Sequence, residues 1–154
     1  MQEGRASRGP ARLGEDMAEL DGVFYKEIVE QGLREFPNEA CGVIAAGPDG
    51  VPVHVFAATN IDVSSVTFRI DAEEQLRIEY EIEGRGWETW GYYHSHTHTE
   101  GYPSQTDRDR SRYVVAFYPD VRFLILSLKD RDAPVLRSFF IRDGEVTEEE
   151  LTIT

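Results

Sequence analysis

The chain has 154 residues, enough for one domain that buries roughly two-thirds of the surface exposed by the unfolded chain. Its 16 basic and 29 acidic residues leave a net charge of −13, which disfavours non-specific binding to nucleic acid or to an anionic membrane surface. One cysteine excludes an internal disulfide, and no apolar stretch approaches the roughly 20 residues that span a bilayer.

The N-terminal segment MQEGRASRGPARLGED carries no hydrophobic period and lacks the apolar centre of a secretory signal. Such a segment buries too little surface to repay the entropy lost on ordering. We therefore predict a disordered tail over 1–16 and a folded domain over 17–154, with Met17 as a candidate natural start. The missing signal favours a cytoplasmic protein.

The first predicted elements are a helix and a hairpin. Apolar residues at helical spacing follow Asp21, an expected N-cap, and predict a helix that ends at Pro37. The continuously apolar segment 41–47 predicts a buried strand. A Pro-Asp-Gly turn connects this segment to a second strand at 51–58, so that the two form a hairpin.

The second half of the chain alternates helix and strand again. Residues 67–70 predict a short strand, and Asp71 caps a second helix that ends near Gly84. The segment 87–94 returns as a strand, and Ser104 caps a helical turn that runs to Ser111. Three further strands are expected, at 123–128, 135–142 and 146–153, the last two joined by an Asp-Gly turn.

His94 and His96 end the strand-forming run that begins at 87. Because side chains alternate along a strand, the two imidazoles project from one face about 7 Å apart. The carboxylate of Asp107, in the next turn, completes a set of three ligands. Two histidines and one aspartate form a typical site for a catalytic zinc, which keeps its fourth position for water. The spacing therefore predicts a metal hydrolase.

The whole pattern reads His94-x-His96, seven residues, Ser104, two residues and Asp107, with Glu39 upstream in Asn-Glu-Ala-Cys-Gly. It resembles the signature of the JAMM, or MPN+, family of zinc isopeptidases, and the resemblance runs from about residue 18 to the end. The segments Tyr-His-Ser-His-Thr, Tyr-Pro-Ser-Gln-Thr-Asp and Leu-Arg-Ser-Phe look most like the bacterial CysO-cysteine peptidases. Those enzymes release cysteine from the C-terminus of a small ubiquitin-like sulfur carrier protein.

The resemblance implies a fold and a division of roles. The fold is a single mixed α/β domain, layered like the zinc deaminases: a curved, largely antiparallel sheet, flanked by two long helices, with Zn²⁺ at one edge. Glu39 would serve as general base for the attacking water, and Ser104 would donate a hydrogen bond to the oxyanion. A deaminase site itself is excluded, because it needs a Cys-x-x-Cys pair that a chain with one cysteine lacks.

Each of these residues also has a structural interpretation. Ser104 fits a helix N-cap, and Asp107 fits a favourable carboxylate in the first turn of that helix. Glu39 could be a solvated turn residue, and Cys41 is expected to pack in the core rather than act as a nucleophile. His98 continues the alternation of the motif histidines, although a position in the following loop is favoured.

Three functions stay open. The first is an (iso)peptidase that cleaves after the C-terminal glycine of a ubiquitin-like sulfur carrier ending in Gly-Gly and so releases cysteine for cysteine biosynthesis. The second is a general deconjugating or precursor-processing isopeptidase, and the third is a non-catalytic MPN scaffold. We expect substrate contacts from 60–68 and 97–103, beside which an extended tail could add as a strand. No oligomeric state is predicted.

Overall fold

A computed structural model describes residues 17–154, so the tail expected over 1–16 lies outside the described residues. The elements are β1 (Met17–Leu20), α1 (Gly22–Glu35), β2 (Cys41–Ala46), β3 (Pro52–Ala58), α2 (Ala72–Gly84), β4 (Glu88–His96), α3 (Gln105–Phe117), β5 (Arg122–Ser127), β6 (Val135–Arg142) and β7 (Glu145–Ile153). Within the described part of the chain, no helix is long and apolar enough to cross a membrane.

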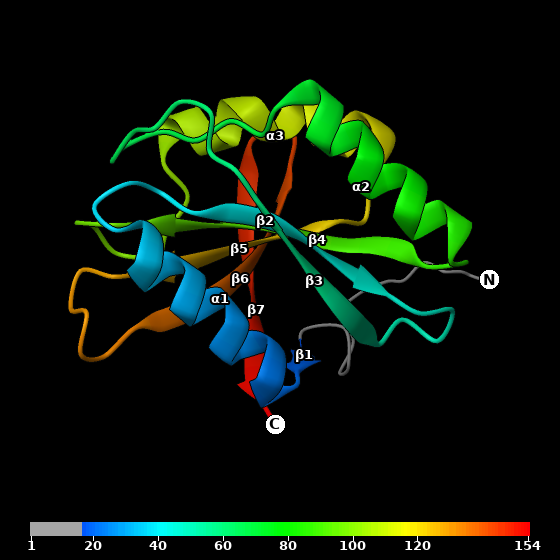
Figure 1. Cartoon of the computed structure of the whole chain (residues 1–154), viewed down its shortest axis with the longest axis horizontal. Coiled ribbons are helices and arrows are strands. Elements are labelled where there is room, and N and C mark those ends of the chain that lie inside the picture. The colour runs from blue at the N-terminus through cyan, green and yellow to red at the C-terminus, as the bar shows by residue number, and fades with distance from the viewer. Residues whose placement is uncertain (1–16) are drawn as a thin grey trace.

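The strands form one mixed, seven-stranded sheet in the order β1-β7-β6-β5-β4-β2-β3. Neighbouring strands are antiparallel except for the parallel pairs β4–β5 and β1–β7. The sheet twists strongly, with α1 on one side and α2 and α3 on the other (Figure 1). The expected mixed α/β fold is confirmed, although three helices rather than two flank the sheet.

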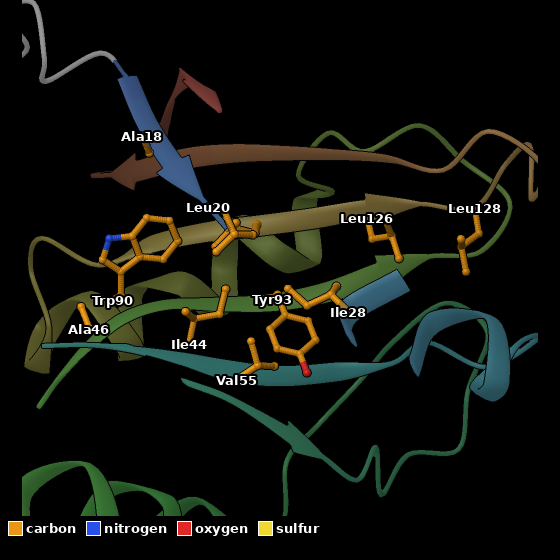
Figure 2. Packing of buried hydrophobic residues seen from close by; sticks show 11 residues of the cluster. Ala18, Leu20, Ile28, Ile44, Ala46, Val55, Trp90, Tyr93, Leu126 and Leu128 are labelled. Carbon is orange, nitrogen blue, oxygen red and sulfur yellow. The ribbon is translucent and has the colours of Figure 1, made fainter. Parts of the chain in front are cut away.

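Alternation along β2 and β4 divides the core into two layers. Ile44 and Tyr93 belong to a cluster with Ile28 of α1, and Figure 2 shows these side chains gathered on that side of the sheet. Val43 and Tyr92 project to the other face, where they pack against α2 and α3. Because the period of a strand is two, the even-numbered residues of β4 that follow Tyr92 face α3.

The prediction of a strand at 67–70 is wrong. Only Ile70 forms a single bridge, to Asn60, and the rest of the segment is irregular. The Asn60 side chain explains this: its Oδ1 accepts from the Arg69 backbone N–H at 3.0 Å, and its Nδ2 donates to the Thr67 carbonyl at 3.0 Å. A side-chain amide thus takes the backbone bonds that a neighbouring strand would otherwise make.

Other boundaries also differ from the prediction. The helix expected to stop at Ser111 continues to Phe117, and Val114 packs against the cluster on that face of the sheet. The strand β1 was not predicted, although Leu20 is fully buried and pairs with β7 in parallel. The hairpin turn is confirmed, since Asp143 and its following glycine have φ of 53° and 80°, as a type I′ turn requires.

Candidate metal centre

The structure brings His94, His96 and Asp107 together at the carboxyl end of β4. Both histidines are buried, and Asp107 comes from the first turn of α3. The Asp107 Oδ2 atom lies 3.2 Å from His94 Nε2 and 3.0 Å from His96 Nε2, and the two Nε2 atoms are 3.2 Å apart. The site lies at the end of an interior strand rather than at an edge strand of the sheet.

The spacing of these three atoms fits a metal ion. Imidazole nitrogens and carboxylate oxygens bind zinc at about 2.0 to 2.2 Å, so tetrahedral geometry separates neighbouring ligand atoms by about 3.3 Å. The three measured separations, 3.0 to 3.2 Å, are close to that value. In the described part of the chain, this is the one group of at least three such side chains converging within 4.8 Å.

Neighbouring groups orient the two imidazoles. His96 Nδ1 lies 2.8 Å from the Glu100 carbonyl. Because a carbonyl only accepts, Nδ1 carries a proton, so that in the neutral imidazole the lone pair is on Nε2, where an ion can take it. The His94 ring stacks on Phe68, with centroids 4.5 Å apart and planes inclined by 23°. Both rings are therefore held with Nε2 toward Asp107.

Ser104 and Asp107 form a capping box at the start of α3. The Asp107 N–H donates to Ser104 Oγ at 3.0 Å, and the Ser104 N–H donates to Asp107 Oδ2 at 2.9 Å. The structural interpretation of both residues is correct, and it is compatible with metal binding, because the cap aims the carboxylate at the histidines. Ser104 accepts in this cap, so its hydroxyl proton stays free to donate to a substrate.

The electrostatics of the centre favour an ionised Asp107. Burial alone would raise the pKa of its carboxyl, but the adjacent His94 and hydrogen bonds from both histidines hold that pKa well below its usual range. Burial would lower the pKa of His96, but the hydrogen bonds to Asp107 and to the Glu100 carbonyl, together with the charges of Asp107 and Glu39, outweigh burial and raise it. The carboxylate is therefore the fixed negative charge of the site.

Glu39 is buried beside this centre, with only 5 % of its surface exposed. Burial raises the pKa of its carboxyl to about 8, while the charges of His96 and Arg110 lower it and that of Asp107 raises it. Its backbone N–H donates to the Ser64 carbonyl at 2.8 Å. A solvated turn position is thus excluded, and the carboxyl is close enough to the centre to respond to its charges.

The raised pKa predicts how the metal-free protein responds to pH. Between pH 4.5 and about 8 folded Glu39 holds a proton that the unfolded chain releases, so the free energy of unfolding should fall as the pH rises through this window. Glu39→Gln lacks this term. After chelation, the free energy of unfolding obtained from urea titrations should fall from pH 5 to pH 9 by more in wild-type protein than in the variant, with a difference on the order of a few kcal/mol. Parallel falls would contradict the assignment.

His98 and Cys41, which the sequence also drew attention to, do not belong to the group of His94, His96 and Asp107. His98 is exposed, and its Nδ1–H donates to Thr97 Oγ1 at 2.8 Å, while Thr97 donates to the Ser65 carbonyl at 3.0 Å. This bond ties the two segments expected to contact substrate. Cys41 is fully buried, and burial raises the pKa of its thiol to about 12, which suits a core residue and not a nucleophile.

Two residues that shape the site, Phe68 and Arg110, were not predicted from the sequence. Phe68 was assigned to a strand, so its ring on His94 was not foreseen. Arg110 follows Asp107 by three residues on α3, where side chains share a face, and it donates to the Phe68 carbonyl. The helical spacing of Arg110 was the available signal, whereas nothing local pointed to Phe68.

Comparison with known proteins identifies the family of the chain. A profile of the family described as prokaryotic homologs of the JAB domain matches residues 23–142. The chain belongs to this family. A solution structure of a protein from Desulfitobacterium hafniense superposes with a TM-score of 0.76 and 32% identity, covering 90% of this chain and 92% of that one. A JAB1/MPN domain protein from Archaeoglobus fulgidus shares the fold, with a TM-score of 0.52 and 17% identity over 88% of this chain and 99% of that one.

Two curated relatives of this JAB-domain chain carry names that state an activity. The CysO-cysteine peptidase of Mycobacterium tuberculosis is 38% identical over 128 residues, which cover 82% of this chain and 84% of the relative. The desampylase of Haloferax volcanii is 36% identical over 93 residues, or 59% of this chain and 63% of the relative. The resemblance to JAMM proteins is confirmed, and the relatives support a hydrolase of the peptidase type.

Proposed function

We propose that this JAB-domain protein is a zinc-dependent peptidase that cleaves after the C-terminal glycine of a ubiquitin-like sulfur carrier and releases cysteine. The observation that carries the proposal is the triangle of His94, His96 and Asp107 with buried Glu39 beside it. The proposed peptidase domain spans residues 17–154. An intact ligand set argues against the alternative of a non-catalytic scaffold.

A zinc ion held by the two Nε2 atoms and Asp107 Oδ2 would polarise the scissile carbonyl and lower the pKa of water. Glu39, held at the site by burial, is the group that takes up a proton at its carboxylate and returns it to the leaving amine. Ser104 Oγ donates a hydrogen bond to the developing oxyanion. Phe68 and the Glu100 carbonyl keep the imidazoles oriented during this sequence.

The proposed substrate is supported by the named relatives and by the two segments expected to contact it. The segments 60–68 and 97–103 lie together, since Thr97 bonds to the Ser65 carbonyl. An extended Gly-Gly tail could lie along these segments through backbone hydrogen bonds, which need no particular side chain. The size of the leaving group would distinguish cysteine release from general deconjugation. A bulky leaving group would misplace the scissile bond at the centre, and cleavage would be slower.

A deconjugating isopeptidase is the competing proposal, favoured by the similarity to the desampylase. The two functions share the centre and differ in the leaving group: free cysteine in one, a lysine side chain of a protein in the other. They therefore predict different rates on two substrates that carry the same ubiquitin-like protein.

The decisive experiment compares a carrier ending in Gly-Gly-Cys with the same carrier joined to a lysine side chain. We expect faster release of free cysteine, measured by mass spectrometry, by at least about tenfold. Asp107→Asn serves as the control for contaminating peptidases and should cleave neither substrate. Preference for the lysine-linked substrate would replace cysteine release by deconjugation, and failure to cleave either would overturn the proposed function.

A further inference from the structure

Ser95 lies between the two metal-binding histidines in sequence, but its side chain belongs to the opposite face of β4. It is 1 % exposed, and its Cβ lies 4.0 Å from the position that a Cβ on Gly32 of α1 would occupy. Its Oγ accepts from the Ala40 backbone N–H at 2.8 Å, and its own N–H donates to the Ala40 carbonyl at 2.9 Å. Two hydrogen bonds thus join Ser95 to the residue after Glu39.

The first of these bonds replaces a normal ladder bond. Cys41 pairs with His94, so Ala40 and Ser95 are the next partners in the antiparallel pair of β2 and β4. Hydrogen-bonded partners in such a pair exchange two backbone bonds. Here a hydroxyl takes the place of one carbonyl acceptor, and β2 begins only at Cys41. The backbone that precedes Cys41 leaves the sheet here, and the contact between Ser95 and Ala40 sets its path at Glu39.

We propose that Ser95 is the positioning residue for Glu39 in the hydrolytic reaction. Its hydroxyl ties the backbone beside the base to the strand that carries both imidazoles, so the distance between base and metal ligands is fixed by one short contact. The second tether of Glu39, from its N–H to the Ser64 carbonyl, comes from the loop and not from the ligand strand. This inference rests on the proposed function, in which Glu39 handles the proton.

Removal of the hydroxyl should act on chemistry more than on binding. In Ser95→Ala the buried Ala40 N–H loses its acceptor, and the backbone at Glu39 is expected to shift or loosen to find another. A displacement of about 1 Å at a catalytic group can lower the rate by about a hundredfold. The imidazoles project from the other face of β4, so zinc binding and KM should change little.

Two measurements test the proposal. Hydrogen exchange of the Ala40 amide, followed by NMR in metal-free protein, should be at least about tenfold faster in Ser95→Ala, because this bond protects it. Turnover of the carrier ending in Gly-Gly-Cys should show kcat reduced at least about tenfold with KM and zinc content within twofold of wild type. Ser138→Ala, another fully buried serine, is the matched control and should leave kcat unchanged.

A double-mutant cycle separates positioning from general stability. If Ser95 acts through Glu39, Ser95→Ala should cost no further kcat in a Glu39→Gln background under single-turnover conditions. An equal loss in both backgrounds, or a loss explained by missing zinc, would overturn the proposal. If Ser95→Ala does not fold, the isosteric Ser95→Cys, a weaker acceptor, undergoes the same measurements. Wild-type protein that cleaves no carrier would refute the proposed function, while the exchange rates would still decide whether Ser95 holds Ala40.

Discussion

Metal-free protein supplied with zinc is expected to bind about one ion per chain, and His96→Ala is expected to bind far less. The two Nε2 atoms and Asp107 Oδ2 already lie 3.0 to 3.2 Å apart, so little rearrangement is needed to bind the ion. Loss of one of three protein ligands leaves a pair that cannot close a tetrahedral site. Elemental analysis after dialysis measures the ratio directly.

His54→Ala is the matched control for that prediction. His54 is exposed on β3, packs beside Phe56 and Trp87, and does not belong to the group of His94, His96 and Asp107. Its removal should leave the zinc ratio unchanged, as should removal of His98. Full occupancy in His96→Ala, or wild-type protein that takes up no zinc, would show that the three side chains are not the ligands.

The convergence of His94, His96 and Asp107 could be predicted from the sequence because it depends on local geometry. A strand places residues two apart on one face, and a Ser-x-x-Asp capping box places the carboxylate at the start of a helix. The positions of His94 and His96 therefore follow once β4 is assigned, and the position of Asp107 follows from the cap at Ser104. The hairpin turn at Asp143 followed from the same kind of local rule.

Features that depend on partners distant in the sequence were not predictable. The segment 67–70 has the composition of a strand, but the Asn60 side chain takes its backbone bonds and no strand forms. The strand β1 is four residues long and exists through pairing with β7, more than a hundred residues away. Local propensity carries no information about such partners.

The environment of Glu39 depends on packing in the same way. The sequence marks a glutamate between a helix and a strand, which fits a solvated turn as well as a buried base. Its backbone is bonded to the Ser64 carbonyl, and the next residue, Ala40, is bonded to Ser95, two contacts that join separate elements. Only the assembled fold distinguishes the two interpretations, through the exposed fraction of the side chain and the raised pKa.

Glu39→Gln is expected to keep the fold and the zinc and to lose at least about a hundredfold in kcat, with little change in KM. The amide has nearly the same shape as the carboxyl but accepts no proton from water. In metal-free protein the amide also avoids the cost of burying a charge, so the metal-free variant should unfold at higher urea concentration than metal-free wild type at pH 9. Single-turnover cleavage of the carrier measures the rate, and elemental analysis of the same sample measures the zinc content.

Glu149→Gln distinguishes loss of the base from the effect of altering a buried glutamate. Glu149 is 3 % exposed and bonds to Arg122 and Ser138 at 2.6 Å in another part of the sheet. Its substitution should lower stability and leave kcat of the folded protein unchanged, since its partners do not belong to the group of His94, His96 and Asp107. Near-normal turnover in Glu39→Gln would remove Glu39 as the base. Loss of zinc in that variant would instead make Glu39 a ligand, because a carboxylate that binds the ion cannot be replaced by an amide without weakening the site.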